Sequence, residues 1–196
     1  MAGRPREFDR DAALVKARDL FWSRGYEGIS MADLTQGLGL ASARIYAAFG
    51  SKEELFREAV ALYEAQEGGF ADRALAEEPT AVRAMQRMFL EAIELYTRKR
   101  GPRGCMVVSA ATNCTNQNEP VREWLAGHRR ARTASIVDRI RKGVESGELT
   151  DDTDLESLGD LFAAALHGIS VQARDGVTRK RLVATVQPLL TLLRTA

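Results

Sequence analysis

The sequence predicts an all-helical protein, with a small N-terminal helix-turn-helix unit followed by a larger C-terminal helical domain. Three observations support this prediction. The stretch 30–52 contains two short helices joined by a glycine turn, longer helices with apolar stripes flank it, and further apolar patterns at helical spacing fill the rest of the chain. The expected domains are residues 1–66 and residues 67–196.

The first half of the stretch 30–52 has the signals of a short, capped helix. Ser30 is expected to cap it, and Asp33 three residues later completes a capping box with the free backbone amides. Gly37 and Gly39 are expected to end the helix, because glycine tolerates the left-handed conformation of a sharp turn.

The second half of this stretch predicts another short helix over residues 42–49, with Ile45 and Phe49 on its inner side. Ser51 then caps the following helix, and Glu54 completes a second capping box. In a helix-turn-helix, such a second helix enters the major groove of DNA, although many other helical hairpins also use glycine turns.

Longer helices flank the pair. Residues 9–24 carry an apolar stripe on an otherwise charged helix that ends at Gly25, and a second amphipathic helix begins at Lys52. The first of these is expected to brace the two short helices as a three-helix unit. The boundary to the next domain is expected at Gly68-Gly69 and the patch 77–79.

Composition is typical of a globular protein and gives no sign of a strongly basic surface. The chain has 196 residues, of which 45% are hydrophobic and 28% charged, with a net charge of +1. Any phosphate contacts must therefore come from a few well-placed residues. We expect a cytoplasmic protein, because the sequence contains no apolar run of membrane-spanning length and no signal-peptide pattern.

The sequence shows no pattern of a catalytic site. Neither a Ser/His/acid order, a phosphate-binding loop nor a paired-carboxylate motif is evident, so we expect no enzyme and no cofactor. Two cysteines, Cys105 and Cys114, and two distant histidines do not suggest a metal site. In a reducing compartment the cysteines are interpreted as small core residues, and a redox-sensing pair is the alternative.

Residue types and their spacing over roughly the first 65 residues form one specific pattern. It consists of Arg4-Pro5-Arg6, Ala17, Leu20-Phe21, Gly25-Tyr26-Glu27-Gly28-Ile29-Ser30, Asp33-Leu34, Leu38-Gly39-Leu40, Ile45-Tyr46, Phe49-Gly50-Ser51-Lys52-Glu53 and Leu55-Phe56. This pattern resembles the N-terminal domain of the tetracycline-repressor (TetR/AcrR) family. Thr35 departs from it, because alanine is usual there. Ala41 stands where a serine usually caps the second short helix, so that cap must come from Ser42 or be lost.

The resemblance implies a homodimeric, sequence-specific DNA-binding regulator that is released from a palindromic operator by a small molecule. Arg44 is expected to contact a base, most simply guanine, while Tyr46 and Lys52 match phosphate contacts. Residues 3–6 form a basic arm that either lies along the duplex or remains a solvated terminus. The expected DNA-binding residues are Arg4, Ser30, Ser42, Ala43, Arg44, Tyr46, Ala47 and Lys52.

The second domain is expected to consist of further helices that serve ligand sensing and dimerisation, as the resemblance implies. The apolar spacing predicts an amphipathic helix over 80–97, a buried segment over 105–112 and a long basic helix from Pro120 to about residue 145. Two apolar helices follow at about 155–173 and 179–193, and Pro188 is expected to kink the last one or to leave a carbonyl free.

The last two helices have wide apolar arcs, for which two interpretations exist. They either pack on their own subunit or, as the resemblance implies, form a four-helix bundle with a second copy. The expected interface residues are Leu158, Leu161, Phe162, Ala165, Leu166, Ile169, Leu182, Val186, Leu189 and Leu190.

The effector pocket is expected among the helices of the second domain, and its apolar surroundings suggest a hydrophobic or amphipathic small molecule. Ordinary core packing is the alternative for each candidate, and His167 is most simply a hydrogen-bonded core residue. The candidates are Phe89, Ile93, Tyr96, Met106, Ser109, Asn113, Trp124, His128, Phe162 and His167.

A helical interaction protein or an architectural DNA-binding protein without a small-molecule inducer is the competing interpretation. The sequence leaves open which operator and which effector such a regulator recognises. It also leaves open whether transcription is repressed or activated.

Overall fold

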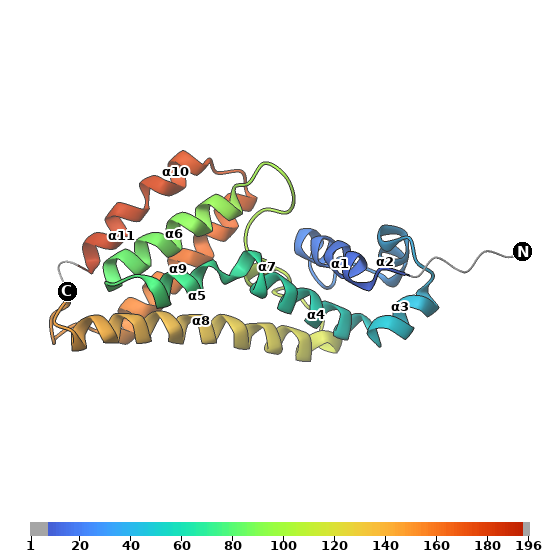
Figure 1. Ribbon diagram of the computed structural model, residues 1–196, viewed down its shortest axis with the longest axis horizontal. Helices are drawn as coiled ribbons and strands as arrows, with labels where there is room; N and C mark the ends of the chain where they lie inside the picture. Colours follow the sequence, from blue (N-terminus) through green and yellow to red (C-terminus); the bar gives the residue numbers. More distant parts are fainter. Residues whose placement is uncertain (1–7, 194–196) are drawn as a thin grey trace, which may run out of the picture.

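The computed structural model describes residues 8–193, and this range is built from helices without a strand (Figure 1). The three N-terminal helices lie at one end of an elongated molecule, and α4 and α8 run from there towards the C-terminal helices (Figure 1). The α-helices are α1 (Arg10–Arg24), α2 (Met31–Leu38), α3 (Ser42–Phe49), α4 (Lys52–Ala65), α5 (Phe70–Glu77), α6 (Ala81–Tyr96), α7 (Met106–Ser109), α8 (Glu119–Glu145), α9 (Leu155–Arg174), α10 (Arg179–Ala184) and α11 (Val186–Leu192), with short 3-10 turns η1 (Glu67–Gly69) and η2 (Asn116–Asn118).

The capping box at the start of α2 is confirmed. The Ser30 hydroxyl accepts from the Asp33 backbone N–H at 3.1 Å, and an Asp33 carboxylate oxygen accepts from the Ser30 N–H at 2.8 Å. Gly39 ends α2 in the left-handed conformation. The expectation that Gly37 also ends it was wrong. Gly37 lies inside the helix, where a Cβ would stand 2.6 Å from a methyl of Leu20, so glycine permits the close approach of α1.

The second capping box is only half formed. The Ser51 hydroxyl accepts from the Glu54 N–H at 3.0 Å, but the Ser51 N–H donates to the carbonyl of Phe49 instead of to the Glu54 carboxylate. The cap of α3 is lost, because Ala41 occupies the cap position without a side-chain acceptor, and Ser42 is already helical. α3 therefore depends on its packing for stability.

Packing holds α3 against the first and fourth helices. Ile45 and Phe49 are buried, as expected. Arg10 of α1 packs over Phe49, with its guanidinium 4.4 Å from the centre of the ring. The same guanidinium donates to the Ala48 carbonyl at 3.2 Å and pairs with Glu58 of α4 at 2.7 Å. One side chain thus joins α1, α3 and α4.

In the C-terminal part, α6 packs against α5, α8, α9, α10 and α11. Helix α5 was not predicted, because the glycines before it and Pro79 after it are typical of a boundary between domains. Phe70, Ala71 and Ala74 are nevertheless buried on one face of this helix. The buried segment 105–112 contains only one helical turn, α7.

The last helix expected over 179–193 is divided at Thr185 into α10 and α11. The Thr185 N–H donates to the Leu182 carbonyl in a tighter turn. Pro188 has no N–H for the carbonyl of Ala184 four residues earlier, which agrees with the expected effect of this proline.

The boundary predicted after residue 66 coincides with the end of α4. Buried side chains nevertheless form one continuous core across it, from α1 and α4 through α7 and α8 to α11. Between residues 8 and 193, no helix combines the length and the apolar character that a bilayer crossing requires.

Candidate nucleic-acid interface and sensor cavity

The outer face of α3 is open to solvent at the end of the molecule opposite α10 and α11 (Figure 1). Tyr46 is 48% exposed, although a large aromatic side chain is usually buried. The exposed residues are those that the sequence predicted to face DNA, namely Ser42, Ala43, Arg44, Tyr46 and Ala47.

Arg44 is a free donor on this face. Within residues 8–193 no acceptor is recorded for its guanidinium, whose planar fork of N–H groups matches the two acceptors on the major-groove edge of guanine. The geometry is therefore compatible with base contact by Arg44, and a DNA duplex would meet no competing protein partner at this side chain.

Two further predicted DNA contacts, Ser30 and Lys52, lie in different surroundings. The Ser30 hydroxyl is engaged by Asp33 in the α2 capping box. Lys52 is half-buried at the start of α4, with its Nζ 4.2 Å from the centre of the Tyr26 ring. Burial lowers the pKa of Lys52, and the charge of the Glu27 carboxylate opposes this shift. Arg4 lies outside the described residues.

Two hydrogen bonds attach the N-terminal helices to the segment before α8. The Trp22 indole N–H donates to the Gly104 carbonyl at 3.0 Å, and the Tyr26 backbone N–H donates to the Ala110 carbonyl at 2.6 Å. Because both acceptors belong to residues 103–111, this segment is called the joint segment below. It lies between the N-terminal helices and the C-terminal helices.

Arg174 at the end of α9 adds a third attachment. Its guanidinium donates to the carbonyls of Trp22 and Ser23, each at 3.1 Å, at the C-terminal end of α1. The same side chain lies 3.4 Å from the Arg103 carbonyl and from the Ser109 hydroxyl. A cation at the carboxyl end of a helix is favourable, so Arg174 holds α1, α9 and the joint segment together.

Glu27 makes a fourth attachment at the start of α8. Its carboxylate accepts from the Thr115 N–H at 2.7 Å, from the Thr115 hydroxyl at 2.8 Å and from the Asn118 amide at 2.8 Å. The hydrogen bonds from Asn118 and Thr115 lower the pKa of Glu27. None of these attachments was predicted, because contacts between residues far apart in the chain, several of them to backbone groups, leave no pattern in the sequence.

A cavity of about 40 Å³ lies on the other side of the joint segment, among α4, α5, α6, α8 and α9. Of the predicted wall residues, Tyr96, His128 and His167 line it. The lining residues are Tyr63, Glu64, Gly68, Phe70, Ala71, Tyr96, Cys105, Val107, Val108, His128, Arg129, Arg132, Leu166 and His167.

The other predicted wall residues do not line this cavity. Four of them are fully enclosed in the core by neighbouring helices, namely Phe89, Ile93, Met106 and Phe162. Trp124 packs edge-on against His128. Ser109 donates to the Cys105 carbonyl, and Asn113 is exposed.

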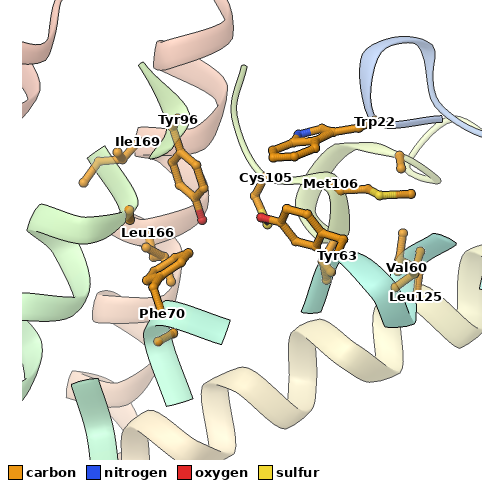
Figure 2. Packing of buried hydrophobic residues seen from close by; sticks show 14 of the residues in the cluster. Trp22, Val60, Tyr63, Phe70, Tyr96, Cys105, Met106, Leu125, Leu166 and Ile169 are labelled. Atoms are coloured by element: carbon orange, nitrogen blue, oxygen red, sulfur yellow. The ribbon is translucent and has the colours of Figure 1, made fainter. Parts of the chain in front are cut away.

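In the cavity wall the Tyr63 hydroxyl meets the sulfur of Cys105, and Tyr96 lies across from this pair (Figure 2). The Tyr63 hydroxyl donates to Sγ at 3.3 Å, and Tyr96 lines the same cavity, where the Cys105 thiol influences its electrostatics. Both tyrosines are 1% exposed. Burial raises the pKa of Tyr63 and of Tyr96 well above the ordinary value, so both phenols remain protonated donors.

The charges around the cavity are unevenly paired. Arg132 forms a two-pronged ion pair with Asp72, and His128 lies 3.0 Å from Glu64. Arg129 donates to the Val107 carbonyl at 2.9 Å, and within residues 8–193 no carboxylate lies within ion-pair distance of it. Burial lowers the pKa of His167, and the neighbouring Arg129 charge lowers it further. Arg129 is therefore a lining cation without a carboxylate partner among the described residues.

An apolar groove of about 580 Å³ separates α9 from α11. Of the predicted interface residues, Ala165, Ile169 and Leu189 line it, Leu161 on the same helix is 43% exposed, and Leu158 is half-buried. The rest of the predicted set is buried in the core of its own subunit, because these residues face α6 and one another. They are Phe162, Leu166, Leu182, Val186 and Leu190.

Comparison with known proteins identifies both parts of the chain. Residues 13–59 match the family described as bacterial regulatory proteins, tetR family, and residues 80–175 match the tetracyclin repressor-like C-terminal domain. The repressor ComR of Escherichia coli K12 is 30% identical over 182 residues, which are 92% of this chain and 87% of ComR. The repressor BdcR of the same organism is 27% identical and covers 93% of this chain and 88% of its own.

A solved structure extends this similarity to the full fold. A cysteine-substituted CifR, a TetR family regulator in complex with 26-bp operator DNA, superimposes with a TM-score of 0.91 and is 44% identical. The match covers 96% of this chain and 98% of the CifR chain. The helices, the exposed α3 and the two family matches lead to one conclusion. The chain belongs to the TetR family of DNA-binding transcriptional regulators.

Proposed function

We propose that this protein is a cytoplasmic, homodimeric repressor that binds a palindromic operator through α3 and is released from it by a small molecule. The observation that carries the proposal is the outer face of α3, where Arg44 and its neighbours are exposed and Arg44 lacks a partner among the described residues. The 44% identical CifR, which was solved with operator DNA, supports the same use of this helix.

The groove between α9 and α11 supports dimerisation through these two helices. Apolar side chains line most of it, and the large side chains of Leu161, Val171 and Leu192 are exposed on the same two helices. A second copy would remove this surface from water and present two α3 helices to half-sites spaced by about one helical turn, roughly 34–36 Å.

The joint segment suggests how a ligand would release DNA. Cys105, Val107 and Val108 line the cavity, while Gly104 and Ala110 on the same segment bond to the N-terminal helices. A ligand that favours another position of this segment would change the separation of the two α3 helices. DNA and effector then oppose each other by the same coupling free energy.

An Arg44→Ala variant tests the DNA-reading role. We expect operator affinity to fall by about 1–3 kcal/mol and base preference to relax at one position per half-site. The measurement is fluorescence anisotropy on DNA from upstream of the protein's own gene and on random DNA, at several salt concentrations. Arg181→Ala on α10, which replaces an exposed arginine at the opposite end, is the matched control.

The results also separate the repressor from an architectural DNA-binding protein. Equal affinity of the unmodified protein for operator and random DNA would favour the architectural role. An Arg44→Ala variant that loses the same affinity on both DNAs would contradict base reading by Arg44.

A further inference from the structure

The size of the cavity limits what it can hold. A volume of about 40 Å³ corresponds to space for about three water molecules. A molecule of that size has few atoms, and each atom contributes only a bounded amount of binding free energy. Reversible contacts alone would therefore hold it weakly, whereas a covalent bond to a wall residue would not have this limit.

The wall contains a nucleophile and two donors that lack a strong acceptor. Cys105 is a free thiol, the Tyr63 hydroxyl donates to its sulfur, and Tyr96 lies across from them (Figure 2). Sulfur is a weak hydrogen-bond acceptor, so the buried Tyr63 phenol has a poor partner, and within residues 8–193 the buried Tyr96 phenol has no stronger one. An oxygen atom placed beside the sulfur would accept from them much better. The electropositive Arg129 lies close by and favours charge developing on such an oxygen.

We propose that Cys105 captures a small carbon electrophile that carries an oxygen acceptor, of the α,β-unsaturated aldehyde type, and that this adduct releases DNA. This inference rests on the proposed function and names the effector class of the same cavity. In the reaction the Cys105 sulfur forms a bond to the β-carbon. The C=C π bond breaks, and its electron pair moves through the α-carbon to the carbonyl oxygen as an enolate.

The reaction needs no further proton donor or acceptor, because the thiol supplies the proton that the product requires. A tyrosine hydroxyl donates a hydrogen bond to the enolate oxygen, and the proton of the thiol ends on the α-carbon, which restores the aldehyde. No group leaves, and no oxidant or reductant is consumed. Tyr63 and Tyr96 are suited to this role because burial keeps both phenols protonated.

The adduct forms at the position where the cavity meets the joint segment. Cys105 directly precedes α7, and its backbone N–H donates to the Ser170 hydroxyl at 2.8 Å. Gly104 before it and Ala110 after it carry the carbonyls that bond Trp22 and Tyr26. Extra atoms on Sγ overfill the small cavity and push the joint segment, so the strain reaches the N-terminal helices.

Cys114 provides an internal comparison. It is a free thiol on the same connection, but it does not line the cavity. Burial raises the pKa of the Cys114 thiol, and the Glu27 charge raises it further, which lowers the fraction of reactive thiolate. Both its position outside the cavity and its raised pKa therefore predict that the adduct forms on Cys105 and not on Cys114.

The test uses the full-length protein bound to its operator fragment and acrolein as the probe. We expect one acrolein per subunit by intact mass, peptide mapping that places it on Cys105, and at least tenfold weaker operator binding with an unchanged helical circular dichroism signal. Cys114→Ser should respond like the wild type, and Cys105→Ser should keep its DNA. Propanal, which matches acrolein in size but lacks the C=C bond, should release no DNA.

A second variant tests the phenol donors. Tyr96→Phe keeps the thiol and the ring but removes one hydroxyl, and we expect adduct formation to slow roughly ten- to hundredfold. An unchanged rate would show that the phenol does not assist the reaction.

Several outcomes overturn the inference while the proposed function stands. These are a Cys105 adduct with unchanged operator affinity, modification of Cys114 in preference to Cys105, equal release by propanal, or release that accompanies unfolding. Failure of the unmodified protein to prefer its operator would instead refute the proposed function.

Discussion

The outer face of α3 and the joint segment differ in whether their polar groups have hydrogen-bond partners within the protein. On α3 the Arg44 guanidinium and the Tyr46 hydroxyl have no recorded partner within residues 8–193. On the joint segment, the carbonyls of Gly104 and Ala110 both accept from the N-terminal helices. Free donors are available to DNA. A segment bonded both to the N-terminal helices and, through Cys105, to Ser170 of α9 can instead pass a displacement from one part of the protein to the other.

The largest expected effect separates the two sides of α3. Phe49 is 3% exposed and packs under Arg10, while Tyr46 is 48% exposed three residues earlier. Phe49→Ala should lower the free energy of unfolding by about 3–5 kcal/mol through the cavity it leaves. Tyr46→Ala should change it by less than about 0.5 kcal/mol and yet weaken DNA binding. Urea denaturation and anisotropy measure the two quantities. Similar stability losses in both variants would contradict the assignment of the two faces.

The next effect concerns Arg174, which holds α1 against α9 and the joint segment. Arg174→Gln removes the charged donor that bonds the Trp22 and Ser23 carbonyls, and we expect the free energy of unfolding to fall by about 1 kcal/mol, given that this side chain is partly solvated. Operator affinity should also fall, because α1 is then held less firmly. Arg179→Gln, which breaks an exposed pair with Glu94, is the matched control. Equal effects of the two substitutions would remove the special role of Arg174.

The comparison also explains what the sequence could predict. The starts of α2, α3 and α4 were predicted to within one residue, because their signals are local. Ser30 and Ser51 cap helices, Gly39 ends one, and the buried Ile45 and Phe49 lie one helical turn apart. Each of these signals acts within one or two helical turns. For the cap of α3 the sequence left two options, a cap from Ser42 or no cap, and the structure shows that the cap is lost.

The cavity could not be predicted in this way. Its wall combines side chains from five helices and the joint segment, and Tyr63, Cys105 and Phe70 each resemble ordinary core residues in the sequence. One of the five helices, α5, was not expected at all. Which apolar residues face a void is decided by packing between distant segments. For the same reason, half of the predicted interface residues of α9, α10 and α11 are core residues of their own subunit.

A smaller effect depends on pH and concerns the contact between Glu27 and the residues just before α8. Because hydrogen bonds from Asn118 and Thr115 lower the pKa of Glu27, its ionised form stabilises the folded state. This stabilisation is complete above the ordinary glutamate pKa of about 4.3 and is lost as the pH falls through the lower folded value. Thermal unfolding of Glu27→Gln should therefore show a deficit at pH 7 that disappears in acid. A deficit that is constant with pH would indicate a steric cause instead of charge.

The smallest effect is a gain on α3. Ala41 occupies the cap position in extended conformation, with φ −65° and ψ 146°, and offers no acceptor to the free amides of the first turn. Ala41→Ser supplies a hydroxyl there and should raise the free energy of unfolding by about 0.5–1 kcal/mol. Ser51→Ala, which removes an existing cap of α4 that accepts from Glu54, should lower it by a similar amount. Urea denaturation of the two variants tests both signs. If Ala41→Ser gave no gain while Ser51→Ala gave the loss, the first turn of α3 would already be held by its packing, and the outer face of this helix would be more rigid than its free polar groups suggest.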